Sequence, residues 1–133
     1  LWNGIEKDRF NSKCSFCDTD FVGTNGENGG KYKDSSTLAD LINKLWPKDT
    51  KNKLVVFTGG EPLLQLNNSL IKSIQLHNFK IAIETNGTIQ APKGINWVCV
   101  SPKFGTDLKI LSGNELKIVY PQKYLMVILF WGK

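Results

Sequence analysis

Apolar residues recur at helical intervals in two stretches of the chain. In residues 38–45 they follow residues 35–37, whose hydroxyl groups are typical of a helix N-cap, and Pro47 ends the pattern. The second stretch, residues 63–77, has the same three- and four-residue spacing of leucine and isoleucine. The sequence therefore predicts one helix in each stretch.

Four short apolar runs predict β-strands. Residues 53–58 form a continuous apolar run, which is typical of a strand buried on both faces, and the other runs cover residues 80–84, 97–101 and 115–120. Strands that alternate with helices indicate βαβ units, a parallel sheet and right-handed crossovers. The expected fold class is therefore α/β. The glycine-rich residues 23–30 are expected to be a flexible loop.

Three of the predicted strands are followed by distinctive residues. The runs are Thr58-Gly59-Gly60-Glu61-Pro62, Glu84-Thr85-Asn86-Gly87 and Ser101-Pro102-Lys103. Each run alone is better explained by a plain turn, because Gly, Pro and Asn are common turn residues. In a parallel sheet, however, the carboxyl ends of the strands share one edge, where ligands bind. We therefore expect a ligand site at that edge.

Cys14 and Cys17 form a Cys-x-x-Cys pair. A total of three cysteines argues against a secreted disulfide framework and for a reducing, cytoplasmic location with a metal or redox role. The pair lacks the preceding strand and following helix of a thioredoxin-like motif. A zinc site needs four ligands, and the remaining candidates, Cys99 and His77, are in no second paired motif. A cluster bound by three cysteines is the other possibility, and Cys99 is expected to be a small buried hydrophobe.

Composition and charge exclude several other classes of protein. The 133 residues are 41% hydrophobic and 22% charged, as in a single globular domain rather than a disordered or collagen-like chain. Seventeen Lys and Arg against twelve Asp and Glu give a net charge of +5, which suits anionic ligands or nucleic acid. The apolar residues 124–131 are far fewer than the roughly 20 that cross a bilayer, so no membrane span is expected.

In their order and spacing, these motifs resemble the radical S-adenosylmethionine superfamily. The Gly-Gly-Glu-Pro turn marks the superfamily, and residues 1–4, 13–24 and 101–103 resemble the 7-carboxy-7-deazaguanine synthase family. The resemblance covers residues 1–122 as a radical S-adenosylmethionine core, and residues 123–133 are expected to be an atypical apolar tail. It implies a partial (βα) barrel, incomplete at both ends.

The resemblance implies a carbon-nitrogen lyase of queuosine or deazapurine biosynthesis. A [4Fe-4S] cluster would chelate S-adenosylmethionine, and a 5′-deoxyadenosyl radical would remove hydrogen from 6-carboxy-5,6,7,8-tetrahydropterin. The ring would then contract, with loss of ammonia, to 7-carboxy-7-deazaguanine. The implied partners are this pterin, a cellular one-electron reductant and, at full length, a second copy of the protein. Neither a membrane nor direct contact with nucleic acid is implied.

The resemblance also implies roles for individual residues. Cys14 and Cys17 match two of the three cluster ligands, Thr19 matches a hydroxyl that binds Mg2+, and Thr58 matches a substrate contact. The positions that match the S-adenosylmethionine site are Phe16, Cys17, Asp18, Gly60, Glu61, Ser101, Pro102 and Lys103. For Glu61, support of its own turn is an equal alternative, and Lys103 could instead be a solvated charge.

One departure from the family pattern concerns the cysteines. The family reads Cys-x14-Cys-x-x-Cys, and only thirteen residues precede Cys14, so the first cluster cysteine is expected two positions before Leu1. The chain by itself is therefore expected to be inactive. The alternative function is a small zinc-binding module with nucleic-acid affinity, which leaves the strand-end motifs unexplained. A glycyl-radical activating enzyme would need a Cys-x-x-x-Cys-x-x-Cys pattern that this chain lacks.

Overall fold

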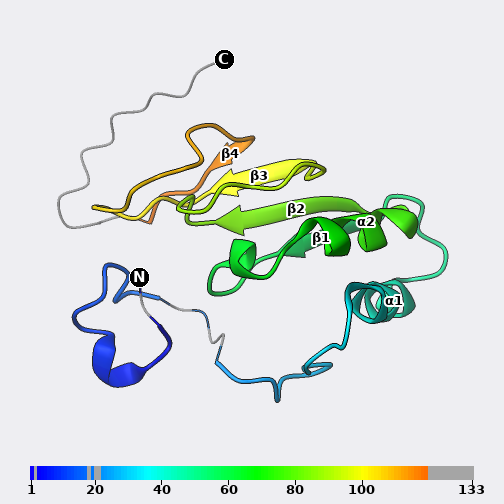
Figure 1. Cartoon of the computed structure of the whole chain (residues 1–133), viewed down its shortest axis with the longest axis horizontal. Helices are drawn as coiled ribbons and strands as arrows, with labels where there is room; N and C mark the ends of the chain where they lie inside the picture. The colour runs from blue at the N-terminus through cyan, green and yellow to red at the C-terminus, as the bar shows by residue number, and fades with distance from the viewer. Residues whose placement is uncertain (2, 18, 20–21, 120–133) are drawn as a thin grey trace.

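The computed structural model describes residues 1, 3–17, 19 and 22–119 (Figure 1). Asp18, residue 120 of the predicted fourth strand and the tail 123–133 lie outside the described residues. The elements, in chain order, are η1 (Glu6–Asp8), α1 (Ser35–Leu45), β1 (Leu54–Phe57), η2 (Pro62–Leu64), α2 (Asn68–Leu76), β2 (Lys80–Thr85), β3 (Trp97–Val100) and β4 (Glu115–Leu116). The α/β fold class is confirmed. Within the described part of the chain, no helix has the length and apolar character needed to cross a membrane.

The four strands form one parallel sheet in the order β1-β2-β3-β4. Phe57 lies opposite Ile83, Thr85 opposite Val100, and Val100 opposite Leu116, so the strands end close to one another. The predicted parallel arrangement is therefore correct. In Figure 1 the strand arrows point toward the side where the N-terminal segment lies.

One face of the sheet and α2 enclose the core. Ile81 and Ile83 of β2 and Ile74 of α2 are completely buried in one hydrophobic cluster. Burial of each such side chain contributes about 1.5–3 kcal/mol. Helix α1 packs chiefly against α2. Just beyond α1, Trp46 meets Phe79 edge to face, with ring centroids 5.3 Å apart.

The other face of the sheet is largely open. Leu54 and Val56 of β1 are 45% and 47% exposed, and Trp97 of β3 is 46% exposed. The prediction that residues 53–58 form a strand buried on both faces is therefore wrong. The apolar run is continuous, but α2 covers only the side that carries Val55 and Phe57.

The helix boundaries differ from the prediction at two places. The N-cap of α1 is Asp34 rather than residues 35–37, because its carboxylate accepts hydrogen bonds from the Thr37 amide and from the Ser36 and Thr37 hydroxyls, each at 2.8 Å. These bonds lower the pKa of Asp34. The predicted helix over residues 63–77 is divided into η2 and α2. Asn67 starts α2 by accepting a bond from the Leu70 amide at 3.0 Å.

The connections between strands depart further from the prediction. Within the described chain, only β1, α2 and β2 form a βαβ unit, and irregular segments join β2 to β3 and β3 to β4. Pro92 and Gly94 disfavour a helix in the first connection. Gly94 has φ +98°, and a Cβ there would lie 2.9 Å from Ile71 Cγ2, so this loop takes the place of a helix against α2. Strand β4 is shorter than expected because its partner β3 ends at Val100, just before Ser101 and Pro102.

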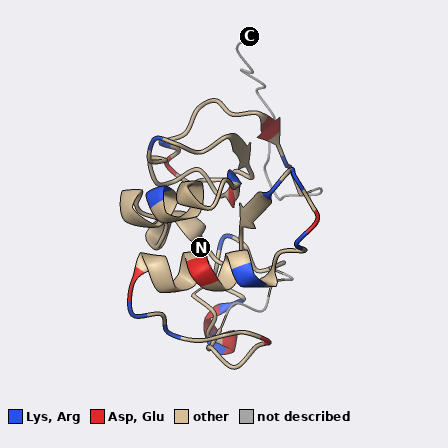
Figure 2. Cartoon of the chain, turned by 90° about the vertical axis from the view of Figure 1, so that its right-hand side faces the viewer, with Lys and Arg blue, Asp and Glu red and all other residues tan. Residues whose placement is uncertain are grey.

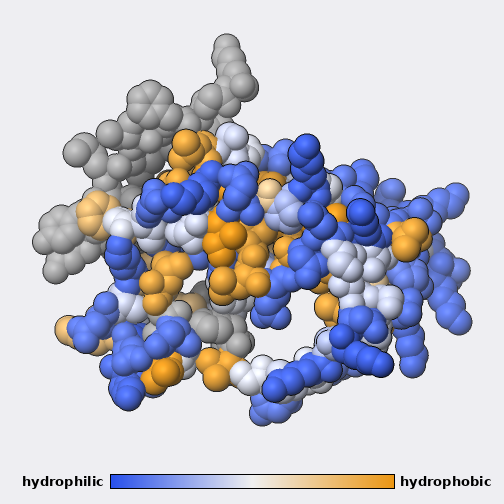
Figure 3. Space-filling model, viewed as in Figure 1, coloured by the Kyte–Doolittle hydropathy of each residue, from blue (hydrophilic) through white to orange (hydrophobic). Residues whose placement is uncertain are grey.

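The glycine-rich segment is a loop, as predicted. Residues 22–31 are exposed and form neither helix nor strand. Figure 3 shows an opening between the segment that leads to α1 and the rest of the molecule. The residues of the N-terminal segment that lie at the edge of the sheet precede this loop.

Candidate functional site

A pocket of about 230 Å³ opens at the carboxyl edge of the sheet. It brings together the ends of all four strands, as expected for a parallel sheet, and the N-terminal segment. The pocket is lined by Leu1, Cys14, Phe16, Cys17, Thr19, Thr58, Gly59, Gly60, Glu84, Thr85, Asn86, Ser101, Lys103, Lys117 and Val119. Most of the site residues expected from the sequence are in this set, whereas Glu61 and Pro102 are not. A larger, mainly apolar groove of about 590 Å³ lies on the open face of the sheet and contains neither Cys14 nor Cys17.

The paired cysteines lie in a turn of the N-terminal segment. The Cys17 amide donates to the Cys14 carbonyl at 3.1 Å, and Cys14 is buried while Cys17 is half-buried. None of the three cysteines is in a disulfide. The short link between the two residues, together with this hydrogen bond, keeps both thiols at the same side of the pocket. This arrangement suits two ligands of one metal centre.

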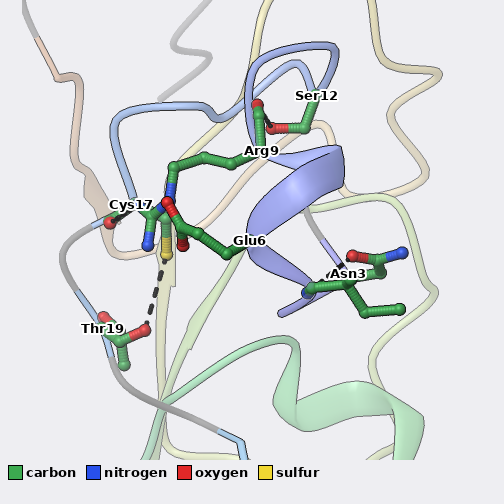
Figure 4. A network of polar contacts seen from close by, with 7 residues as sticks. Asn3, Glu6, Arg9, Ser12, Cys17 and Thr19 are labelled. Atoms are coloured by element: carbon green, nitrogen blue, oxygen red, sulfur yellow. Dashed lines mark hydrogen bonds and ion pairs between the residues drawn. The ribbon is translucent and has the colours of Figure 1, made fainter.

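Arg9 holds the cysteine turn in place. Its Nη1 donates to the Cys17 carbonyl at 2.7 Å and its Nε donates to Glu6 Oε2 at 2.9 Å. Figure 4 shows the Arg9 side chain reaching toward Cys17, with Glu6 beside it and Thr19 on the far side of the sulfur. The Cys17 thiol contacts the Thr19 carbonyl at 3.9 Å. Lys13 adds a long-range link by donating to the carbonyl of Gly105, in the loop that follows β3.

The turn after β1 presents backbone to the pocket. Gly59 has φ +105°, which disfavours any residue with a Cβ, and a Cβ built there meets nothing within 4 Å. Thr58, Gly59 and Gly60 all line the pocket. The backbone at Gly59 is therefore open to close approach, and the ligand contact expected of Gly60 stays a prediction.

Glu61 is turned toward the protein. Its Oε1 accepts from the Leu63 amide at 3.1 Å and from the Thr85 hydroxyl at 2.7 Å, and its Oε2 accepts from the Asn86 amide at 2.9 Å. Of the two alternatives for Glu61, the structure supports the one in which it stabilises the turn. The contacts also join this turn to the one that follows β2.

Lys103 is a half-buried cation at the pocket wall. Its ammonium donates to the Ser101 carbonyl at 2.6 Å and to the Ser101 hydroxyl at 2.7 Å. Burial lowers the pKa of Lys103, although the nearby Cys14 and Cys17 thiols act in the opposite direction. Two of its three N–H groups bond to Ser101, which leaves one directed elsewhere. The position at a pocket wall favours a ligand contact over a solvated surface charge.

Glu84 and Lys117 also line the pocket, and the sequence assigned them no role. Lys117 Nζ lies 3.1 Å from Glu84 Oε2. The pair is partly exposed, with side chains 54% and 39% accessible, so it stabilises the fold by at most about 1 kcal/mol. Glu84 begins a recognised strand-end motif. Lys117 lies inside the strand predicted over residues 115–120, so its place just after β4 could not be seen without the structure.

The arrangement does not support the zinc module. Among the described residues, no three His, Cys, Asp or Glu side chains come together as metal ligands. His77 Nε2 lies 2.9 Å from Asp40 Oδ1, within hydrogen-bond distance. Cys99 is 2% exposed and lines the groove on the open face, so the expectation that it is a buried hydrophobe is confirmed. Burial is the main cause that raises the pKa of Cys99, and the charges of Glu115 and Glu84 add to it.

The chain is thus a parallel α/β protein with a pocket at the carboxyl edge of its sheet, lined by paired thiols, glycine backbone and a lysine. No family model matches the chain. It is 53% identical over 122 residues to the 7-carboxy-7-deazaguanine synthase of Bradyrhizobium diazoefficiens. The matched region covers 92% of this chain and 58% of the relative. It is 52% identical to the synthase of Bordetella pertussis over the same shares, and 51% identical to that of Caulobacter vibrioides over 95% of this chain and 60% of the relative.

The chain is therefore similar to curated 7-carboxy-7-deazaguanine synthases over most of its own length, as its motifs indicated. The chain spans about 58% of the length of the curated relatives it matches.

Proposed function

We propose that this chain forms the cofactor-binding part of a 7-carboxy-7-deazaguanine synthase. The proposed reaction is the conversion of 6-carboxy-5,6,7,8-tetrahydropterin to 7-carboxy-7-deazaguanine with loss of ammonia. The observation that carries the proposal is the pocket in which Cys14, Cys17, Gly60 and Lys103 meet at one edge of the sheet. The similarity to proteins named as this synthase supports the same conclusion.

The donor set fits part of a cluster site. Cys14 and Cys17 offer two thiolates at one side of the pocket, and iron-sulfur clusters are held by cysteine thiolates. Cys99 lines a different groove, so we propose that a third thiolate comes from another part of the longer family polypeptide. When bound, a [4Fe-4S] cluster supplies the electron that cleaves S-adenosylmethionine and so starts the radical reaction.

The chain's own residues would bind and orient the ligands. The Lys103 ammonium, held by Ser101, offers a positive charge to a carboxylate. Gly59 leaves open space beside the backbone at the pocket, and Gly60 lines the pocket next to it. Phe16 at the pocket wall offers an apolar surface. Thr58 remains the proposed substrate contact, and the Thr19 hydroxyl the proposed Mg2+ ligand. The roles of Asp18 and Pro102 stay predictions.

The sheet is proposed to be a section of a (βα) barrel, and residues 1–122 its core. The proposed partners are a one-electron reductant and a second copy of the full-length protein. Direct binding of nucleic acid is not part of the proposal. In support, Figure 2 shows basic and acidic residues interspersed on the side viewed, with no continuous basic face there.

A chimera tests this function. In it, the matched segment of this chain replaces the corresponding segment of the Bradyrhizobium synthase, and anaerobic formation of 7-carboxy-7-deazaguanine is measured. We expect product from the chimera and at least a hundredfold less from its Cys17→Ser variant. A chimera that folds and binds iron and sulfide normally but forms no product would contradict the proposal. The 133-residue chain alone is expected to give no turnover.

A further inference from the structure

The Glu61 carboxylate connects two turns of the pocket without lining it. Its three hydrogen-bond donors belong to its own turn, at Leu63, and to the turn after β2, at Thr85 and Asn86. Thr85 and Asn86 line the pocket, but Glu61 does not. Any influence of Glu61 on a ligand can therefore pass through these neighbours.

The network around Glu61 contains buried polar groups. Thr85 is 2% exposed and Asn86 is 8% exposed, and they are the buried polar residues of the described chain. The Thr85 hydroxyl also accepts from the Gly87 amide at 3.1 Å, and Asn86 Oδ1 accepts from the Thr88 amide at 2.9 Å. Buried polar groups are costly unless they are paired, so these hydrogen bonds favour one arrangement of the two turns.

We propose that Glu61 is a positioning residue whose two carboxyl oxygens fix the turn after β1 to the turn after β2. This keeps Thr58 and Gly60 at a set position relative to Thr85 across the pocket. Glu61 thus acts on the ligand through the two turns, and direct contact with S-adenosylmethionine is not required. The proposal rests on the proposed function only for the identity of the ligand.

The chemistry of the three donors explains why a carboxylate is needed. All three partners donate, and they approach both oxygens of Glu61. A glutamine has one acceptor oxygen and one NH2 group. In one orientation its NH2 group would face the Asn86 amide, and in the other it would face the Leu63 amide. Glu61→Gln therefore breaks the connection with almost no change of shape, and Thr85→Val removes the hydroxyl in the same way.

The first test is amide hydrogen exchange in the 133-residue chain, followed by NMR. In Glu61→Gln, we expect the amides of Leu63 and Asn86 to exchange at least tenfold faster than in the wild type. The Ile81 amide, which bonds to Asn96 at 2.8 Å, should keep its rate. Glu115→Gln is the matched control, because Glu115 accepts from Trp97 Nε1 and lies outside this pocket. Unchanged rates at Leu63 and Asn86, or equal acceleration at Ile81, would overturn the proposal.

The second test separates positioning from direct contact. Binding of S-adenosylhomocysteine is measured by calorimetry for Glu61→Gln, Thr85→Val and the double variant. If Glu61 acts through Thr85, each single variant raises the dissociation constant at least threefold. The dissociation constant of the double variant is then no higher than that of the more affected single variant. Multiplied effects would overturn the positioning role and indicate direct contact. If the wild-type chain does not bind the nucleoside, the proposed cofactor site fails for this chain, and the exchange result alone decides the role of Glu61.

Discussion

Three glycine-to-alanine variants separate backbone strain from steric conflict in this fold. Gly26 has an ordinary φ and open space around a built Cβ, and Gly59 has φ +105° and the same open space. Gly94 has φ +98°, and its Cβ would lie 2.9 Å from Ile71 Cγ2 and 3.1 Å from Gln75 Nε2. The same substitution therefore adds only a methyl group at Gly26, a methyl group and backbone strain at Gly59, and strain together with a steric clash at Gly94.

The expected magnitudes follow from these environments. A Cβ at positive φ costs about 1–2 kcal/mol, and overpacking against a core residue costs about 1–3 kcal/mol more. The lower entropy of the unfolded chain returns about 0.4–1 kcal/mol in every case. We therefore expect Gly26→Ala to be neutral or slightly stabilising, Gly59→Ala to cost about 1 kcal/mol, and Gly94→Ala to cost about 2–4 kcal/mol.

Urea unfolding followed by circular dichroism measures the three free energies of unfolding, with the slope m checked for constancy. Ile71 is 2% exposed and cannot move away freely, so the clash at Gly94 should persist. If Gly94→Ala is no more destabilising than Gly59→Ala, the loop after β2 does not pack on α2 as described. If Gly59→Ala and Gly26→Ala change the free energy of unfolding by the same amount, the turn beside the pocket does not hold Gly59 at a positive φ.

Three further predictions concern the core, a helix cap and a thiol. Ile74→Ala should lower the free energy of unfolding by about 2–5 kcal/mol. Leu76→Ala should have little effect, because the Leu76 side chain is 83% exposed. A similar loss of stability in both variants would contradict the assigned buried face of α2. Because hydrogen bonds lower the pKa of Asp34, the stability that it contributes is complete above the unfolded pKa and is lost as the pH falls through the folded value. Asp34→Ala should therefore be less stable than the wild type at pH 7, and a difference that does not shrink in acid would disprove this. Cys99 should react with iodoacetamide at least tenfold more slowly than Cys17 at pH 8, because it is buried and its pKa is raised, and mass spectrometry of the labelled peptides gives both rates.

The sequence predicted which strand ends meet better than it predicted the layers of the fold. Thr58, Thr85 and Ser101 follow apolar runs, and parallel strands bring such positions to one edge, whatever connects them. The faces of each strand that other elements cover could not be predicted from the sequence in the same way. Leu54 and Val56 are apolar whether or not another layer covers them, and only the placement of α2 decides which face of β1 is buried.

The cysteine turn shows why the remaining part of the site needs a structure. Cys14 and Cys17 lie far from the strands in sequence, and no hydrophobic periodicity fixes the segment that carries them. Their position depends on single polar contacts: Arg9 with the Cys17 carbonyl, and Lys13 with the carbonyl of Gly105 in the loop after β3. Each contact depends on the direction of a long side chain, which local propensity does not determine. The same holds for Lys117, whose place in the pocket follows from the register of a two-residue strand against β3. Parallel topology is therefore sufficient to predict which strand ends meet, and specific hydrogen bonds decide which other segments join them.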